Sequence, residues 1–211
     1  MPQPLSTFDR IAAANQGAHI SIGGLSSNYG VPNQIFFGKE QFASLSMDVI
    51  ARWSTLEMTV LLTMARLVGG PTKGAFSTYA ELRSKNAKTP AIKIIAKLTI
   101  GVAQHKLVDR IFKFYDACEK SRNTIAHHTW GFFHNRNDAI LLVDPVDLIN
   151  RTGDLAPSKV FVWRVSDFIE LTRKLHELTM CVDSMSGLRN DQEDKKTYEA
   201  NIDLKLKMFS F

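Results

Sequence analysis

Residues 121–131, which read SRNTIAHHTWG, bring a guanidinium, a carboxamide and two imidazoles together within one short stretch. Arg122 lies four residues after Cys118 and three before Ile125, at a spacing where a core helix would carry an aliphatic side chain. A guanidinium keeps its charge, so its burial requires a carboxylate or a phosphate as partner. The stretch therefore predicts a binding site for an anionic group or a buried ion pair.

A helix must position this stretch, because apolar residues recur upstream at spacings of three and four. Its apolar stripe consists of Val108, Ile111, Phe112, Tyr115, Cys118 and Ile125. We predict a helix from about residue 107 to about residue 127. His127 follows Arg122 by five residues, roughly 140° around the helix. The segment 129–133 is β-branched and aromatic, so the helix must end here, where the long Arg122 side chain and His127 can converge.

The order Arg122, Asn123, three residues and His127 resembles the signature of the HEPN superfamily, small helical bundles that carry an Arg, four to six residues and a His. Asn123 occupies the place where that family often has a polar residue. Trp130 and Gly131 look like the continuation in one uncharacterised branch of the superfamily. The resemblance covers roughly residues 39–186, and it departs from a minimal bundle at the β-like segment 129–165.

The resemblance implies a metal-independent ribonuclease or RNA-binding protein that acts as a homodimer, with the Arg–His pairs of two subunits facing one cleft. In that scheme His127 accepts the proton of a ribose 2′-hydroxyl, and Arg122 stabilises charge on the phosphoryl oxygens. Asn123 positions the phosphate or orients His127, and His128 donates a proton to the leaving oxygen. The scheme requires neither a metal nor another cofactor, and Trp130 supports the site.

A different class of function is a non-catalytic HEPN-like module that binds a nucleotide or a partner protein. There His127 would stabilise the helix end through the helix dipole, and Arg122 would pair with Glu57. Glu57 lies in the apolar seam of a long helix predicted for residues 39–68, so we predict that the two form a buried pair; alternatively, Glu57 reaches water at the margin of the seam.

Two further readings of the histidines and serines carry less weight. Metal binding by His127, His128 and His134 is a further alternative, although adjacent histidines point to different sides and no familiar ligand spacing completes the set. A hydrolase with a Ser/His/Asp triad is the other alternative, but the sequence contains no strand–Ser–helix turn that would hold the nucleophilic serine.

The remaining pattern is mainly helical. The long seam comprises Phe42, Leu45, Val49, Trp53, Leu56, Val60, Met64 and Leu67, and Gly69-Gly70-Pro71 ends that helix. We also predict a short helix at 76–82, a helix starting at Thr89-Pro90, a β-hairpin from Trp130–Phe133 and Ala139–Val143, and a third strand at Lys159–Val165. Asp167 and Glu170 resemble a capping box that opens the last long helix, whose seam is Phe168, Leu171, Leu175, Leu178, Val182 and Met185.

The predicted fold is thus mainly α: a HEPN-like helical bundle with a small β-hairpin or three-stranded insertion before the last long helix. An irregular N-terminal arm (1–38) precedes the helical domain (39–186), and a charged tail (187–211) follows it and either adds a strand or stays disordered. The long helix, near 45 Å at ~1.5 Å per residue, has more apolar seam than one small bundle covers, which favours a homodimer.

Composition fits a cytoplasmic protein. The chain has 211 residues, which favours one domain, and a formal net charge of +5, which permits an anionic partner such as RNA or a nucleotide. Its two cysteines, Cys118 and Cys181, lie on apolar helix faces and are predicted to be reduced core residues. No basic leader with an apolar run and no long apolar stretch is present, so we expect neither secretion nor a membrane span.

Overall fold

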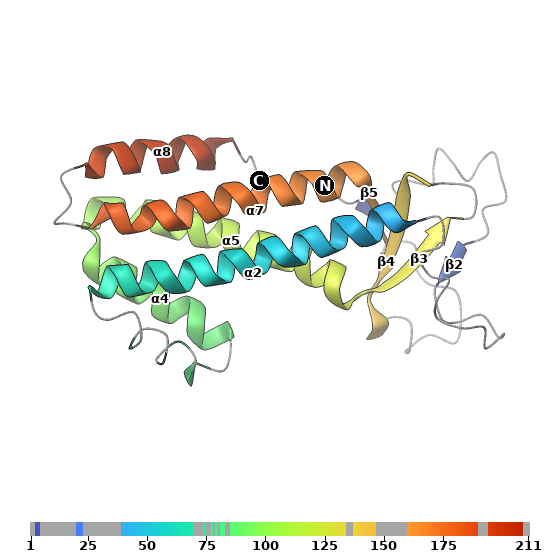
Figure 1. Ribbon diagram of the computed structural model, residues 1–211, viewed down its shortest axis with the longest axis horizontal. Helices are drawn as coiled ribbons and strands as arrows, with labels where there is room; N and C mark the ends of the chain where they lie inside the picture. Colours follow the sequence, from blue (N-terminus) through green and yellow to red (C-terminus); the bar gives the residue numbers. More distant parts are fainter. Residues whose placement is uncertain are drawn as a thin grey trace. The chain divides into compact units, whose positions relative to one another are not determined.

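A computed structural model of the chain describes residues 39–69, 85–133, 137–146, 160–189 and 194–208, with shorter pieces at 3–4, 20–22, 74, 77, 79 and 81–82 (Figure 1). The chain divides into two compact units. The first comprises Met1–Ile50 and Lys120–Thr172, and the second comprises Ala51–Glu119 and Arg173–Phe211. Three long helices, α2 (Glu40–Val68), α5 (His105–His127) and α7 (Val165–Ser184), contribute residues to both. The predicted mainly helical class is therefore confirmed.

The first unit contains an antiparallel sheet in the order β1-β5-β4-β3-β2. β3 (Thr129–Phe133) and β4 (Ala139–Val143) form the predicted hairpin, and β5 (Val160–Arg164) is the predicted third strand. β1 (Gln3–Pro4) and β2 (Ile20–Ile22) pair with β5 and β3. The N-terminal arm was predicted to be irregular, so for these two pieces the prediction is wrong. Unpaired sheet edges accept such short strands, which carry too few residues to show an alternating pattern.

The central strand β4 is buried along its whole length, which explains its continuous apolar sequence. Leu141 and its neighbours on one face form an apolar cluster with the facing side chains of β5: Ala139, Leu141, Val143, Val160 and Val162. Trp163 of β5 packs against Phe168 of α7, with ring centroids 5.2 Å apart, and Phe168 packs edge-on against Phe42 of α2 at 5.8 Å. These rings join the sheet to the helices within the first unit.

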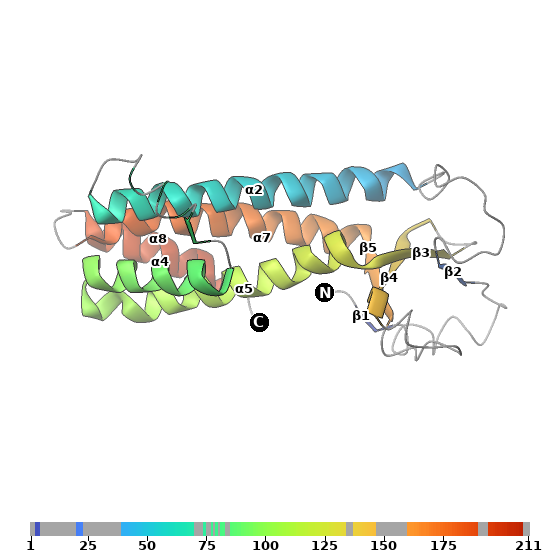
Figure 2. The same ribbon diagram turned by 90° about the horizontal axis from the view of Figure 1, so that it is seen from below.

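The second unit is helical. α4 (Lys85–Thr99) runs alongside the first half of α5, as Figure 2 shows, and an ion pair between Lys97 and Asp109 at 2.9 Å links them. Over both units the predicted seams are confirmed except at Leu45, which is half-buried: the other seam residues predicted for α2, α5 and α7 are buried, and Met185, the last of them, lies just past the end of α7. Cys118 and Cys181 are buried free thiols, and burial raises the pKa of each to about 12.

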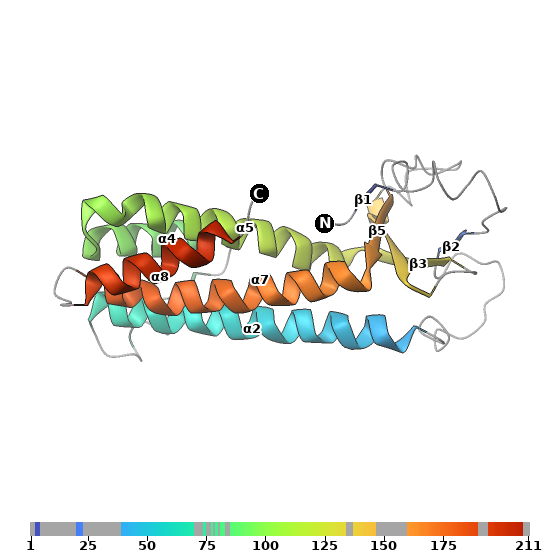
Figure 3. The ribbon, with the colours of Figure 1, turned by 90° about the horizontal axis from the view of Figure 1, so that it is seen from above.

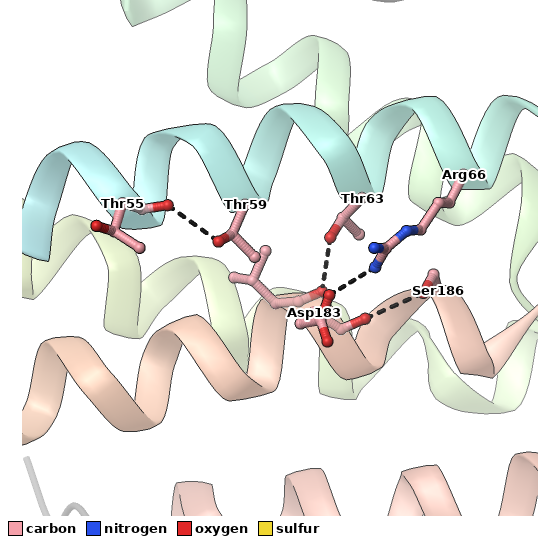
Figure 4. Close-up of polar contacts among 7 residues, drawn as sticks. Thr55, Thr59, Thr63, Arg66, Asp183 and Ser186 are labelled. Atoms are coloured by element: carbon pink, nitrogen blue, oxygen red, sulfur yellow. Dashed lines mark hydrogen bonds and ion pairs between the residues drawn. The ribbon is translucent and has the colours of Figure 1, made fainter. Parts of the chain in front are cut away.

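Polar contacts fix the packing of α2 against α7 within the second unit (Figure 4). The fully buried Thr63 hydroxyl donates to the carbonyl of Val182 at 3.1 Å, and Arg66 pairs with Asp183 at 2.6 Å. α2 ends as predicted at Gly69, whose φ of +68° favours glycine and whose N–H donates to the carbonyl of Ala65.

Two predicted helix starts are wrong. α4 begins at Lys85, not at Thr89, and therefore contains Pro90. α7 begins at Val165, and Asp167, in its first turn, accepts a hydrogen bond from the backbone N–H of Arg164 at 2.9 Å. Arg164 therefore occupies the N-cap position, and Asp167, three residues later, caps the backbone N–H of Arg164 from the first turn of the helix. In the predicted short helix at 76–82, residues 77, 79 and 81 are helical, and residues 76, 78 and 80 lie outside the described residues.

The charged tail forms a helix, α8 (Lys195–Lys207), which lies along α7 in Figures 1 and 3, so its prediction as a strand or a disordered segment is wrong. Ile202 and Leu206, one helical turn apart, are buried. Asp203 pairs with Arg110 of α5 at 2.6 Å, and Lys205 pairs with Glu177 of α7 at 2.5 Å. The apolar residues that alternate from Ile202 to Leu206 fit a strand, but Ile202 and Leu206 also lie on one face of a helix. The burial of these two side chains favours the helix over the strand.

Gly187, in the 3-10 turn η4 (Met185–Leu188), leaves no room for a side chain. A Cβ atom there would lie 2.4 Å from the Tyr198 ring of α8. We expect Gly187→Ala to lower the free energy of unfolding by about 1–3 kcal/mol in urea denaturation. Gly74→Ala is the matched control, because no atom lies within 4 Å of its added methyl group. In the double variant with Tyr198→Ala, the loss of unfolding free energy should be smaller than the sum of the losses of the two single variants. If the two losses simply add, the Gly187→Ala methyl group does not clash with the Tyr198 ring.

Candidate functional site

The predicted motif occupies the last turns of α5 and the start of β3, all within the first unit. The helix continues to His127, and the backbone N–H of His128 still donates to the carbonyl of Thr124 at 3.1 Å. The indole N–H of Trp130 then donates to the carbonyl of Ile125 at 3.2 Å. Trp130 therefore satisfies a free carbonyl of the last helical turn and fixes the transition from helix to strand.

Arg122 is half-buried and contacts its neighbour Asn123. Its Nη1 donates to Asn123 Oδ1 at 3.0 Å, whereas its Nε is buried without an acceptor. Within the described residues, Arg122 makes no ion pair with a carboxylate. The charged guanidinium of Arg122 is thus held by a neutral amide, and its remaining N–H groups can donate hydrogen bonds to an anion.

The two histidines differ in their surroundings. His127 is exposed at the C-terminus of α5, and His128 is half-buried. In the described part of the chain, Arg122 forms no hydrogen bond with either imidazole. The sequence therefore located Arg122, Asn123, His127, His128 and Trp130 on one helix end, and the structure joins Arg122 directly to Asn123.

The prediction that Glu57 is buried is wrong. Its side chain is exposed, and it belongs to the second unit. Trp53 and Leu61, four residues to either side of Glu57, are buried, yet the Glu57 side chain itself reaches solvent, where a carboxylate stays hydrated.

We therefore expect Glu57→Ala to change the free energy of unfolding by no more than about 0.5 kcal/mol, as is usual for exposed positions. Urea denaturation of the two proteins at the same pH measures this. A loss of about 3 kcal/mol or more would instead support the buried pair with Arg122.

No group of three His, Cys, Asp or Glu side chains with the geometry of a metal site occurs among the described residues. His134, which the three-histidine alternative requires, lies outside them. Among the described residues, no helix combines the length and the apolar character needed to span a bilayer.

Comparison with known proteins gives no further assignment for this site. No protein-family model matches the sequence, and no curated protein or solved structure shows significant similarity to the chain.

Proposed function

We propose that this protein is a metal-independent endoribonuclease of the HEPN type whose site is the C-terminal end of α5. The observation that carries the proposal is the half-buried guanidinium of Arg122, which contacts the neutral amide of Asn123. Such a charge favours an anionic partner, and a planar guanidinium suits a phosphate group. The net charge of +5 is compatible with a polyanionic substrate.

In the proposed reaction, neutral His127 accepts the proton of a ribose 2′-hydroxyl, and the 2′-oxygen attacks the adjacent phosphorus. The bond from phosphorus to the 5′-oxygen breaks, and protonated His128 donates a proton to that oxygen. Arg122 stabilises the charge on the non-bridging oxygens, while Asn123 holds the guanidinium in place. The products are a 2′,3′-cyclic phosphate and a free 5′-hydroxyl. His127 is exposed, so RNA can reach its imidazole.

A homodimer, in which the motifs of two subunits face one cleft, is part of the proposal and rests on the resemblance alone. Of the eight seam residues that suggested a dimer, Leu45 is half-buried and the other seven are buried within one chain, so the seam itself gives little support for a second subunit: Phe42, Val49, Trp53, Leu56, Val60, Met64 and Leu67. Sedimentation at micromolar concentration measures the subunit count, and a species of 23.7 kDa alone would contradict the dimer.

The test of the reaction is cleavage of single-stranded RNA by the purified protein in EDTA. Cleavage should persist without divalent metal and should stop on a substrate with 2′-deoxyribose at the scissile position, because no attacking hydroxyl remains. If no RNA is cleaved but a nucleotide or RNA protects the end of α5 from hydrogen exchange, the non-catalytic binding module replaces the ribonuclease.

A further inference from the structure

A cavity of about 200 Å³ lies in the second unit, between α2, α4 and α5, and no residue of the proposed ribonuclease motif lines it. Its wall contains Val60, Thr89 and Ile92 and, in addition, the charged and aromatic residues Glu57, Tyr79, Lys88, Phe112, Tyr115 and Glu119. Two carboxylates and one ammonium group therefore line the cavity, and a second ammonium group, that of Lys93, lies beside its Phe112 ring. A small cavity that combines rings with converging polar groups is typical of a binding site for a small molecule.

The two carboxylates reach the cavity from different helices. Glu57 is an exposed residue of α2, and Glu119, on α5, is only 8% exposed. Burial raises the pKa of the phenols of Tyr79 and Tyr115, and Glu57 and Glu119 raise both further. Both carboxylates therefore lie close enough to both phenols to disfavour a further negative charge there.

The aromatic rings of the wall already have cations beside them. The Lys88 ammonium lies 4.4 Å from the centroid of the Tyr79 ring, and the Lys93 ammonium lies 5.4 Å from that of Phe112. Tyr115 is held in place by Trp53, whose ring centroid is 4.9 Å away. These distances are those of cation–π contacts, so the rings offer their faces to positive charge.

We propose that this cavity binds a small organic cation, an alkylammonium or guanidinium group, through the Glu57 carboxylate and the Tyr79 ring, with the Lys88 ammonium as an internal competitor. The two carboxylates disfavour an anionic ligand, and the charged wall disfavours a purely apolar one. Lys88 is half-buried on a flexible stem and forms no ion pair within the described part of the chain, so a ligand can displace it from Tyr79 at small cost.

The experiment uses the full chain with ¹³C-labelled tyrosine rings, titrated at constant ionic strength with methylguanidinium. N-methylurea serves as the neutral probe of similar shape, and acetate serves as the anion. We expect saturable shifts of the Tyr79 and Tyr115 signals with methylguanidinium and none with the other two probes. Equal shifts with N-methylurea, or no saturable shift with methylguanidinium, would overturn the proposal.

We expect two variants to change the affinity for methylguanidinium in opposite directions. Lys88→Gln removes the competing cation and should tighten methylguanidinium binding by about twofold to fivefold, the size of one exposed cation–π contact. Glu57→Gln keeps the shape of the side chain but removes its charge, and it should weaken binding by about fivefold. Lys106→Gln removes an exposed charge on α5 that does not line the cavity, and it should leave the affinity unchanged. If Lys88→Gln and Lys106→Gln tighten binding equally, the effect is one of net charge and the proposal is wrong.

Discussion

His127→Ala should lower RNA cleavage by about 100-fold or more while it changes the free energy of unfolding by less than about 1 kcal/mol. The two effects separate because His127 is exposed at the end of α5. Its removal creates no cavity, but it takes away the proposed proton acceptor. Initial rates on a fluorescent single-stranded RNA and urea denaturation of the same preparations measure the two quantities.

The matched control is His176→Ala, which removes an exposed histidine of α7 outside the motif and should leave cleavage intact. Arg122→Lys should lower RNA cleavage as His127→Ala does, because the ammonium group of a lysine cannot reproduce the two-donor contact of a guanidinium with phosphate. Full activity of either motif variant would exclude the proposed chemistry. A contaminating nuclease would be revealed if all three variants cleaved RNA at the rate of the wild type.

Ile202→Ala should lower the free energy of unfolding by about 2–5 kcal/mol, because the Ile202 side chain of α8 is fully buried and its truncation leaves a cavity. The charged pairs around it are mostly exposed and contribute little by comparison. Asp203, for example, pairs with Arg110 and Lys207 at side-chain exposures between 33% and 70%. Apolar burial therefore holds α8 in place, and urea denaturation measures its contribution.

Leu204→Ala provides the internal comparison for α8. The change removes the same kind of side chain from the same helix, but Leu204 is 64% exposed, so the cost should stay below about 1 kcal/mol. Hydrogen exchange should show faster opening of the α8 amides in Ile202→Ala than in Leu204→Ala. Equal stabilities of the two variants would mean that α8 does not pack as described.

The sequence determined the helical seams because each is long and strongly periodic. In a helix as long as α2, apolar residues that recur every three or four positions specify which face is buried. Trp53, Leu56 and Val60 lie on this buried face, as predicted. It also located β3, β4 and β5, since β3 and β5 are rich in β-branched and aromatic residues and β4 is a short apolar run that follows a turn. The cluster of Arg122, Asn123 and His127 at a helix end follows from the same pattern, because residues close in sequence share one helix terminus.

Tertiary structure decided what short or distant segments do. Ile20–Ile22 becomes a strand because a sheet edge is available, and the tail becomes α8 because Ile202 and Leu206 are buried within the second unit, of which the tail is part. Glu57 is exposed although Trp53 and Leu61, four residues to either side, are buried, because the spacing rule does not show which positions of a helix face the neighbouring helices cover. The cavity of Glu57, Tyr79 and Lys88 has no sequence signature at all, because its wall is assembled from segments that only folding brings together.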